Sequence, residues 1–89
     1  MIINDLVLGS FLIVKLRTLV RVPIITVYKS PKDYPNKYVA RLWDGKKNKP
    51  THYVVVRDKL EEVRKSIPKH MFRLGPSSMD DPVIVETWI

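Results

Sequence analysis

The chain has 89 residues, 45% of them hydrophobic and 28% charged, a composition typical of one globular domain with one hydrophobic core. It contains no cysteine, which excludes disulfide bonds, thiol catalysis, zinc–thiolate sites and iron–sulfur clusters. The formal net charge is +7, with +8 in residues 1–57 and −1 in residues 58–89. A basic surface favours acidic partners, either nucleic acid or protein, and carries no information about the fold.

The first 22 residues form an apolar arm whose structure is ambiguous. Residues 6–14 lack charge, but nine residues are too few for a membrane span, which needs about 20. No basic residue precedes this run, as one would in a signal peptide, so we expect a cytoplasmic protein with no membrane contact. From 12 to 22, apolar residues alternate with basic ones, which favours a strand over a helix.

An apolar arm of this kind promotes aggregation if it stays exposed. We therefore expect it to pack as a central strand of its own domain or to pair with a second copy across a two-fold axis. Pro23 ends the arm abruptly, and this favours the homodimer.

Three strands are predicted next, over residues 24–29, 37–43 and 51–57, from their alternation and β-branched content. A proline-containing loop over 30–36 joins the first two. Tyr28, Tyr34 and Tyr38 lie around this loop and are expected to close a small satellite cluster under it, with a binding role as the alternative. The Asp44-Gly45 pair predicts a hairpin loop over 44–50.

A helix is predicted over residues 58–67. Asp58 and Glu61 form a variant of the capping box at its start, and a proline follows its end. Leu60, Val63 and Ile67 form a narrow apolar stripe that must face the sheet.

A short strand within 71–74, a loop over 75–82 and a final strand over 83–89 complete the chain. The sequence thus predicts a single α+β domain, residues 1–89, with a small antiparallel sheet in β-β-β-α-β order. The helix covers one face of the sheet in the core, residues 23–89, and residues 1–22 add the N-terminal apolar strand or arm.

Catalytic and metal-binding constellations are weak. His52 and His70, the only histidines, lie beside a strand and just after the helix, where histidines are usually solvated. Asp80 and Asp81, with Glu86 downstream, could hold a divalent cation through oxygen ligands, but aspartate before a proline is ordinary turn chemistry. We expect no enzyme, no cofactor and no metal site.

The hairpin loop suggests nucleic-acid binding. Its lysines could contact phosphates, and flanking aromatic side chains could stack on unpaired bases. The candidate residues are Arg41, Trp43, Lys46, Lys47, Lys49, Tyr53 and Arg57. A lysine-rich loop is also a common solvated surface, and the two aromatic residues could equally be core residues, since alternation alone does not say which face is buried.

The runs 37–42 and 53–58, followed by Leu60-Glu61-Glu62-Val63, resemble the amino-terminal domain of HicB-type antitoxins. The similarity covers residues 24–67. Members of that group have a degenerate ribonuclease-H-like sheet and sequester a small ribonuclease toxin, and many carry a separate DNA-binding segment. Here Lys59 replaces the usual threonine, the lysine loop replaces a Pro-Gly-Cys turn, and a strand follows where a DNA-binding segment is common.

Together these observations lead to two functional hypotheses. The first is a small non-catalytic binding or regulatory protein, HicB-like at most, whose partner is another protein. The alternative is a single-stranded nucleic-acid-binding module that uses the basic hairpin loop 44–50. A metal-dependent hydrolase is a distant third.

Overall fold

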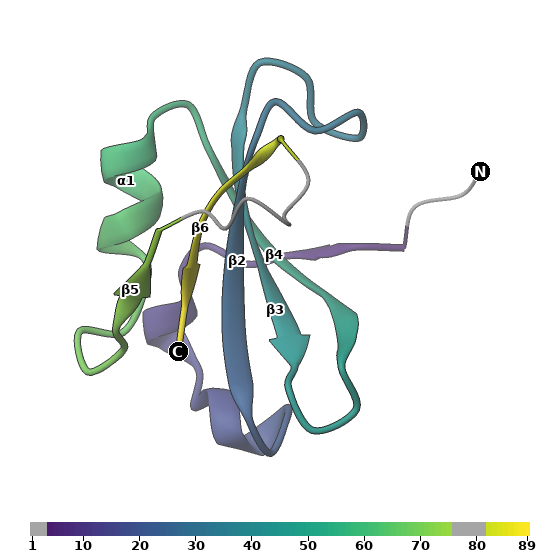
Figure 1. The fold of residues 1–89 in the computed structure, drawn as a ribbon, viewed down its shortest axis with the longest axis vertical. Coiled ribbons are helices and arrows are strands. Elements are labelled where there is room, and N and C mark those ends of the chain that lie inside the picture. Colours follow the sequence, from purple (N-terminus) through teal and green to yellow (C-terminus); the bar gives the residue numbers. More distant parts are fainter. Residues whose placement is uncertain (1–3, 76–81) are drawn as a thin grey trace.

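The computed structural model describes residues 4–75 and 82–89. In this part of the chain, a twisted six-stranded sheet is joined by one short helix and two 3₁₀ turns (Figure 1). The strands and helix are β1 (Leu6–Val7), β2 (Pro23–Lys29), β3 (Tyr38–Asp44), β4 (Lys49–Arg57), α1 (Leu60–Lys65), β5 (Arg73–Leu74) and β6 (Ile84–Trp88). The predicted α+β class, antiparallel-dominated sheet and β-β-β-α-β order, formed by β2, β3, β4, α1 and β6, are confirmed.

The strands lie in the order β1-β4-β3-β2-β6-β5. All neighbouring pairs are antiparallel except β1 and β4, which are parallel. No helix among the described residues is long and apolar enough to cross a membrane.

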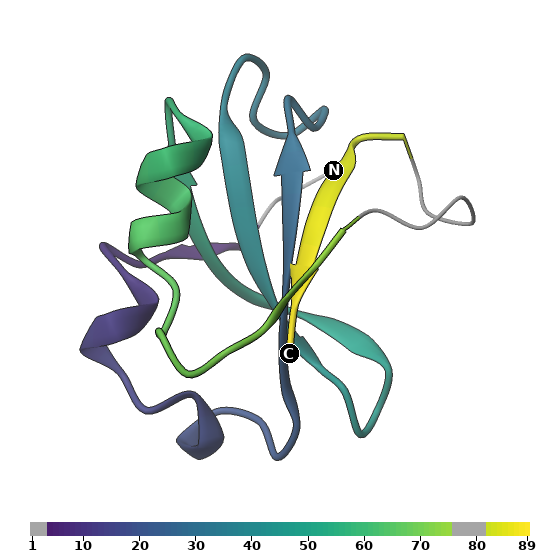
Figure 2. The ribbon, with the colours of Figure 1, turned by 60° about the vertical axis from the view of Figure 1, so that its left-hand side comes forward.

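The two faces of the sheet have different roles. We call the face covered by α1 the inner face; it carries Ile25, Val27, Leu42 and Val55, which belong to one buried core. Helix α1 and the two 3₁₀ turns that follow β1 lie on this side of the sheet (Figure 2). The opposite face, which we call the outer face, carries the alternate residues of the same strands. The predicted helix stripe is confirmed, because Val63 and Ile67 are buried and Leu60 packs against the same core.

The prediction of a strand over residues 12–22 is wrong. The segment forms two 3₁₀ turns, Phe11–Ile13 and Leu16–Thr18, and strand β1 lies at the edge of the sheet, not at its centre. Ser10 is the N-cap of the first turn, since its side chain accepts a hydrogen bond from the Leu12 amide at 3.0 Å. The buried side chains are Phe11, Leu16 and Val20, and the last two are four residues apart, a helical spacing that the alternation concealed. The arm therefore packs within its own domain.

Helix α1 begins two residues later than predicted. Its N-cap is Lys59, whose side chain makes no capping hydrogen bond, whereas Asp58 forms an ion pair with Lys37. The carboxylate of Asp58, which the capping box would use, is thus paired with Lys37, the residue before β3. The helix ends at Lys65, and the hydroxyl of Ser66 donates to the Val63 carbonyl at 2.6 Å.

The hairpin between β3 and β4 has a loop of residues 45–48, shorter than the predicted 44–50, because Lys49 and Pro50 belong to β4. The Asp44 carboxylate accepts the amides of Lys46 and Lys47, and Asn48 adopts the left-handed conformation at φ 54°. Gly45 serves a different need. A Cβ there would lie 2.9 Å from the Val22 carbonyl oxygen, which accepts the Gly45 amide at 2.8 Å.

Candidate functional site

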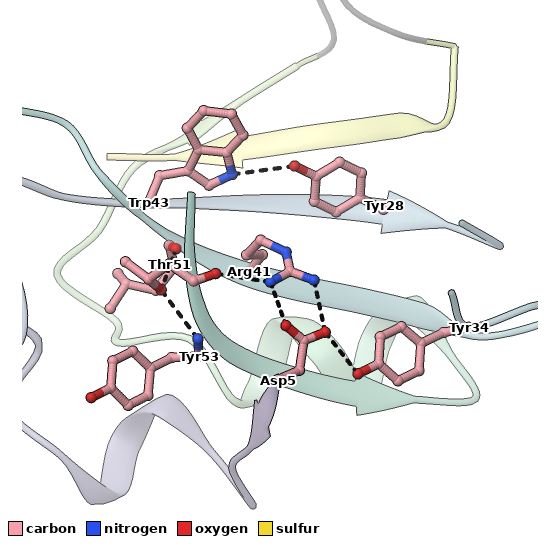
Figure 3. Close-up of polar contacts among 8 residues, drawn as sticks. Asp5, Tyr28, Tyr34, Arg41, Trp43, Thr51 and Tyr53 are labelled. Atoms are coloured by element: carbon pink, nitrogen blue, oxygen red, sulfur yellow. Dashed lines mark hydrogen bonds and ion pairs between the residues drawn. The ribbon is translucent and has the colours of Figure 1, made fainter. Parts of the chain in front are cut away.

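The outer face carries a polar network around Arg41 (Figure 3). The Arg41 guanidinium donates through both terminal nitrogens to the Asp5 carboxylate, at 2.8 and 2.9 Å, and also to the Thr51 carbonyl at 2.8 Å. The Tyr34 hydroxyl donates to the same carboxylate at 2.9 Å. The side chains of Asp5 and Arg41 are only 5% and 17% exposed. This forked ion pair attaches the N-terminal segment to the middle of the sheet.

Charge and burial shift the acid–base properties of these three groups. The pKa of Asp5 is lowered, chiefly because its carboxylate accepts hydrogen bonds from Arg41, and burial only partly opposes this. The pKa of Arg41 is raised by the same hydrogen bonds. Burial, followed by the Asp5 carboxylate, raises the pKa of Tyr34. All three groups therefore keep their ordinary ionisation states near neutral pH.

Beside this network lies a hollow of about 220 Å³ with aromatic walls, which we call the outer-face hollow. Tyr28, Tyr34 and Trp43 line it together with Arg41 and the buried Val39. The indole nitrogen of Trp43 donates to the Tyr28 hydroxyl at 3.2 Å (Figure 3). Pro31 and Asp33, from the loop after β2, and Pro50, opposite Trp43 on β4, complete its rim.

The structure divides the residues predicted for nucleic-acid binding between two faces. Arg41 and Trp43 lie on the outer face, and the exposed Lys46, Lys47 and Lys49 lie at the hairpin next to it. Tyr53, in contrast, packs against the buried core on the inner face. Arg57, on the same side, donates hydrogen bonds to the carbonyls of Gly9 and Val56. Arg41 and Trp43 therefore lie together at the hollow, the three lysines lie on the adjoining hairpin, and Tyr53 and Arg57 do not join them.

Sequence reasoning missed three residues of this site. The sequence predicts that Tyr28 and Tyr34 close a cluster under the proline-containing loop, whereas the structure places them in the wall of the hollow. Their position beside that loop is the sequence signal that could have located them. No local pattern connects Asp5 with Arg41, which is 36 positions away.

A second, larger hollow is lined by residues of the N-terminal 3₁₀ turns and by Ile89. Figure 1 shows these turns and the C-terminus in the lower part of the molecule. This groove has a volume of about 670 Å³. Its deeper wall consists of the core residues Phe11, Leu16 and Met71. Leu12, Val22 and Ile89 also line it, although 56%, 49% and 51% of their surfaces are exposed.

The polar side chains that line this groove are all basic or neutral. Lys15, Arg17 and Arg21 come from the N-terminal segment, and His70 follows helix α1. All four are exposed, and no acidic residue is among the described residues that line the groove. We refer to this site as the basic-rimmed groove. The alternating sequence pattern already contains Lys15, Arg17 and Arg21. The strand predicted from that pattern places them on a solvent-facing side and does not predict a groove.

Glu86 has a structural role in this arrangement. Its side chain is 1% exposed on the inner face, accepts hydrogen bonds from Arg64 of α1 at 2.7–3.3 Å and accepts the indole N–H of Trp88 at 2.7 Å. The contact with this buried carboxylate also raises the pKa of Arg64. Asp80 and Asp81, the other two residues of the cation hypothesis, lie outside the described residues. Within residues 4–75 and 82–89, no three His, Asp or Glu side chains gather in a metal-binding group.

The fold and these surfaces define a small α+β domain with an aromatic hollow on one face and a basic-rimmed apolar groove at one end. Comparison with models of known protein families, with curated proteins and with solved structures finds no match to this chain.

Proposed function

We propose that this chain is a small non-catalytic binding protein that engages another protein through the basic-rimmed groove. The observation that supports this most directly is the half-exposed state of Leu12, Val22 and Ile89 around one open hollow. Soluble domains rarely leave several large apolar side chains together in water unless a partner covers them. Full burial of such a side chain is worth about 1.5–3 kcal/mol, so covering the remaining half of all three contributes about 2–5 kcal/mol.

Charge indicates which partner fits. Lys15, Arg17 and Arg21 surround the groove, so a segment that inserts apolar side chains and carries flanking aspartates or glutamates is complementary to it. A second copy of this strongly basic chain would bring like charge to the same rim unless it used its acidic residues there. The proposed occupant is therefore an acidic, apolar segment of a different protein.

The resemblance to HicB-type antitoxins points to the same class of function. It implies a protein partner, which belongs to this proposal, as does the cytoplasmic location expected from the sequence. The resemblance rests on the order of three strands and a helix over residues 24–67, together with one short motif, and that order is present in β2, β3, β4 and α1.

The test is affinity capture from native lysate with the full chain as bait, with and without nuclease, followed by mass spectrometry. Two charge-reversal variants make a matched pair, since each replaces three exposed basic residues by glutamate. The groove variant is K15E/R17E/R21E and the hairpin variant is K46E/K47E/K49E. Both change the net charge equally and alter only exposed side chains.

We expect a protein that survives nuclease treatment, is captured by the wild type and the hairpin variant, and is lost with the groove variant. Val22→Asp, which places a charge in the apolar part of the groove, should also lose it. If the groove variant captures the same proteins as the wild type, or if every captured protein disappears after nuclease treatment, the proposal is wrong.

A further inference from the structure

We infer that the outer-face hollow binds an unpaired base of a single-stranded nucleic acid, while the hairpin lysines contact its phosphates. This site is separate from the basic-rimmed groove and shares no residue with it. It also differs from the site expected from the sequence, because Tyr28 and Tyr34 join it and Tyr53 and Arg57 do not.

The first argument is the chemistry of the walls. Tyr28, Tyr34 and Trp43 surround one small hollow, whereas Phe11 and His70 are the aromatic side chains among the described residues that line the larger groove at the end of the molecule. Aromatic side chains and guanidinium planes are the surfaces on which unpaired bases stack. A hollow of about 220 Å³ has room for one flat heteroaromatic ring and not for a folded peptide element.

The second argument is that the site is already ordered. The hydrogen bond from Trp43 to Tyr28 and the one from Tyr34 to Asp5 orient the aromatic rings through their polar ends (Figure 3). Arg41 is held by its fork to Asp5. A ligand therefore enters without ordering these side chains, which removes one of the main costs of binding.

The third argument is electrostatic. The charge of Arg41 is balanced by Asp5, so its guanidinium offers a flat surface and not a free phosphate contact. Asp33, exposed at the rim, supplies an acceptor for the N–H groups of a base. A phosphate is repelled by this carboxylate, so the phosphates must lie elsewhere.

The hairpin supplies the place for them. Trp43 and Pro50 pair at the base of the hairpin and also line the hollow, so the loop continues directly from its rim. Three exposed lysines, Lys46, Lys47 and Lys49, lie on this loop and at the start of β4. A base in the hollow and the neighbouring phosphates on the lysines match the two parts of a single-strand site.

The two tryptophans of the chain provide the test, because they lie on opposite faces. Trp43 lines the hollow, whereas the Trp88 indole donates to the buried Glu86 on the inner face. In a titration of the ¹⁵N-labelled full chain with short single-stranded oligouridine and oligoadenosine, we expect the Trp43 indole resonance to shift and that of Trp88 to stay.

Three comparisons separate base binding from simple attraction of a polyanion. An abasic oligomer of the same length should shift lysine-loop amides and leave the Trp43 indole unchanged. Trp43→Leu should weaken oligonucleotide binding about 5- to 150-fold, which corresponds to about 1–3 kcal/mol. The hairpin variant K46E/K47E/K49E should remove binding, while the groove variant K15E/R17E/R21E, with the same change in net charge, should keep most of it.

Salt gives an independent check. Three phosphate contacts predict a slope of about −2 for the logarithm of the binding constant against the logarithm of salt concentration. The inference is overturned if the Trp43 resonance stays unchanged at millimolar oligonucleotide, if the abasic oligomer shifts it equally, or if only residues near Tyr53 and Arg57 respond. A proline-rich peptide that shifts Trp43 while oligonucleotides do not would assign the hollow to a protein ligand instead. Because the groove is not involved, none of these outcomes bears on the proposed protein partner.

Discussion

Replacing Asp5 by alanine tests whether the fork to Arg41 holds the N-terminal segment onto the sheet. Two hydrogen bonds from Arg41 and one from Tyr34 end on this carboxylate, whose side chain is only 5% exposed. Removing one partner of a well-buried ion pair costs about 3–5 kcal/mol. Arg41 keeps its bond to the Thr51 carbonyl and some contact with water, so we expect a smaller loss, of about 2–4 kcal/mol. For a domain of this size, with a total stability of about 4–13 kcal/mol, that is a large fraction.

The assay is urea denaturation of four proteins: the wild type, Asp5→Ala, Arg41→Met and the double variant. If the two side chains stabilise the fold mainly through each other, removing Asp5 in the Arg41→Met background should cost much less than in the wild type. Equal costs in both backgrounds, or an Asp5→Ala protein as stable as the wild type, would refute the reasoning.

The same pair makes stability depend on pH in a defined direction. The pKa of Asp5 in the folded protein lies below its ordinary value of 3.8, because Arg41 stabilises the carboxylate. The unfolded chain therefore takes up the proton first as pH falls. The contribution of Asp5 is complete above the ordinary pKa and is lost as pH decreases through the lowered one. Asp5→Ala should remove this part of the acid sensitivity, as measured by urea titrations at a series of acidic pH values.

Three further expectations concern packing and assembly. Val63→Asp should prevent folding, since Val63 is fully buried between α1 and the sheet, and circular dichroism would detect a folded variant that contradicts this. Gly45→Ala should destabilise by about 1–3 kcal/mol in thermal or urea melts, because its Cβ would lie within 3 Å of the Val22 backbone; unchanged stability would mean that the loop yields freely. The homodimer expected from the apolar arm stays a prediction. It would have to use side chains that remain exposed, such as Leu6, Val7 and Ile13, and light scattering that shows a monomer at high concentration would exclude it.

The elements that the sequence predicts well are those specified by local pattern. Alternation and β-branched content located β2, β3, β4 and β6, and the spacing of Leu60, Val63 and Ile67 located α1 with its buried side. The strand predicted over residues 12–22 is wrong because two local patterns compete there, whereas the error at the helix start involves a distant residue. Lys37 takes the carboxylate of Asp58 from the helix cap.

The candidate site was predictable in composition and not in geometry. Whether Tyr53 shares a face with Arg41 depends on strand register, and Arg41 pairs with Val54, so its neighbour Tyr53 points to the inner face. That register includes an irregularity between Arg41 and Trp43, which no sequence rule located. Arg64 illustrates the same limit, because its helical position suggests a solvated residue, whereas it pairs with a buried carboxylate from β6.

The parallel pairing of β1 with β4 has a consequence for how the chain is made. Strand β1 pairs with β4, where Leu6 aligns with Tyr53. Strand β2 pairs with β3 on one side and with β6 on the other, where Ile25 aligns with Trp88. During synthesis, the segment before β2 emerges from the ribosome before β4 and β6 have been made. Its apolar side chains, including Phe11 and Leu16, then remain in contact with water and with other nascent chains until β4 and β6 follow. The interval between the emergence of β1 and that of β6 is therefore the period in which these apolar side chains lack their packing partners.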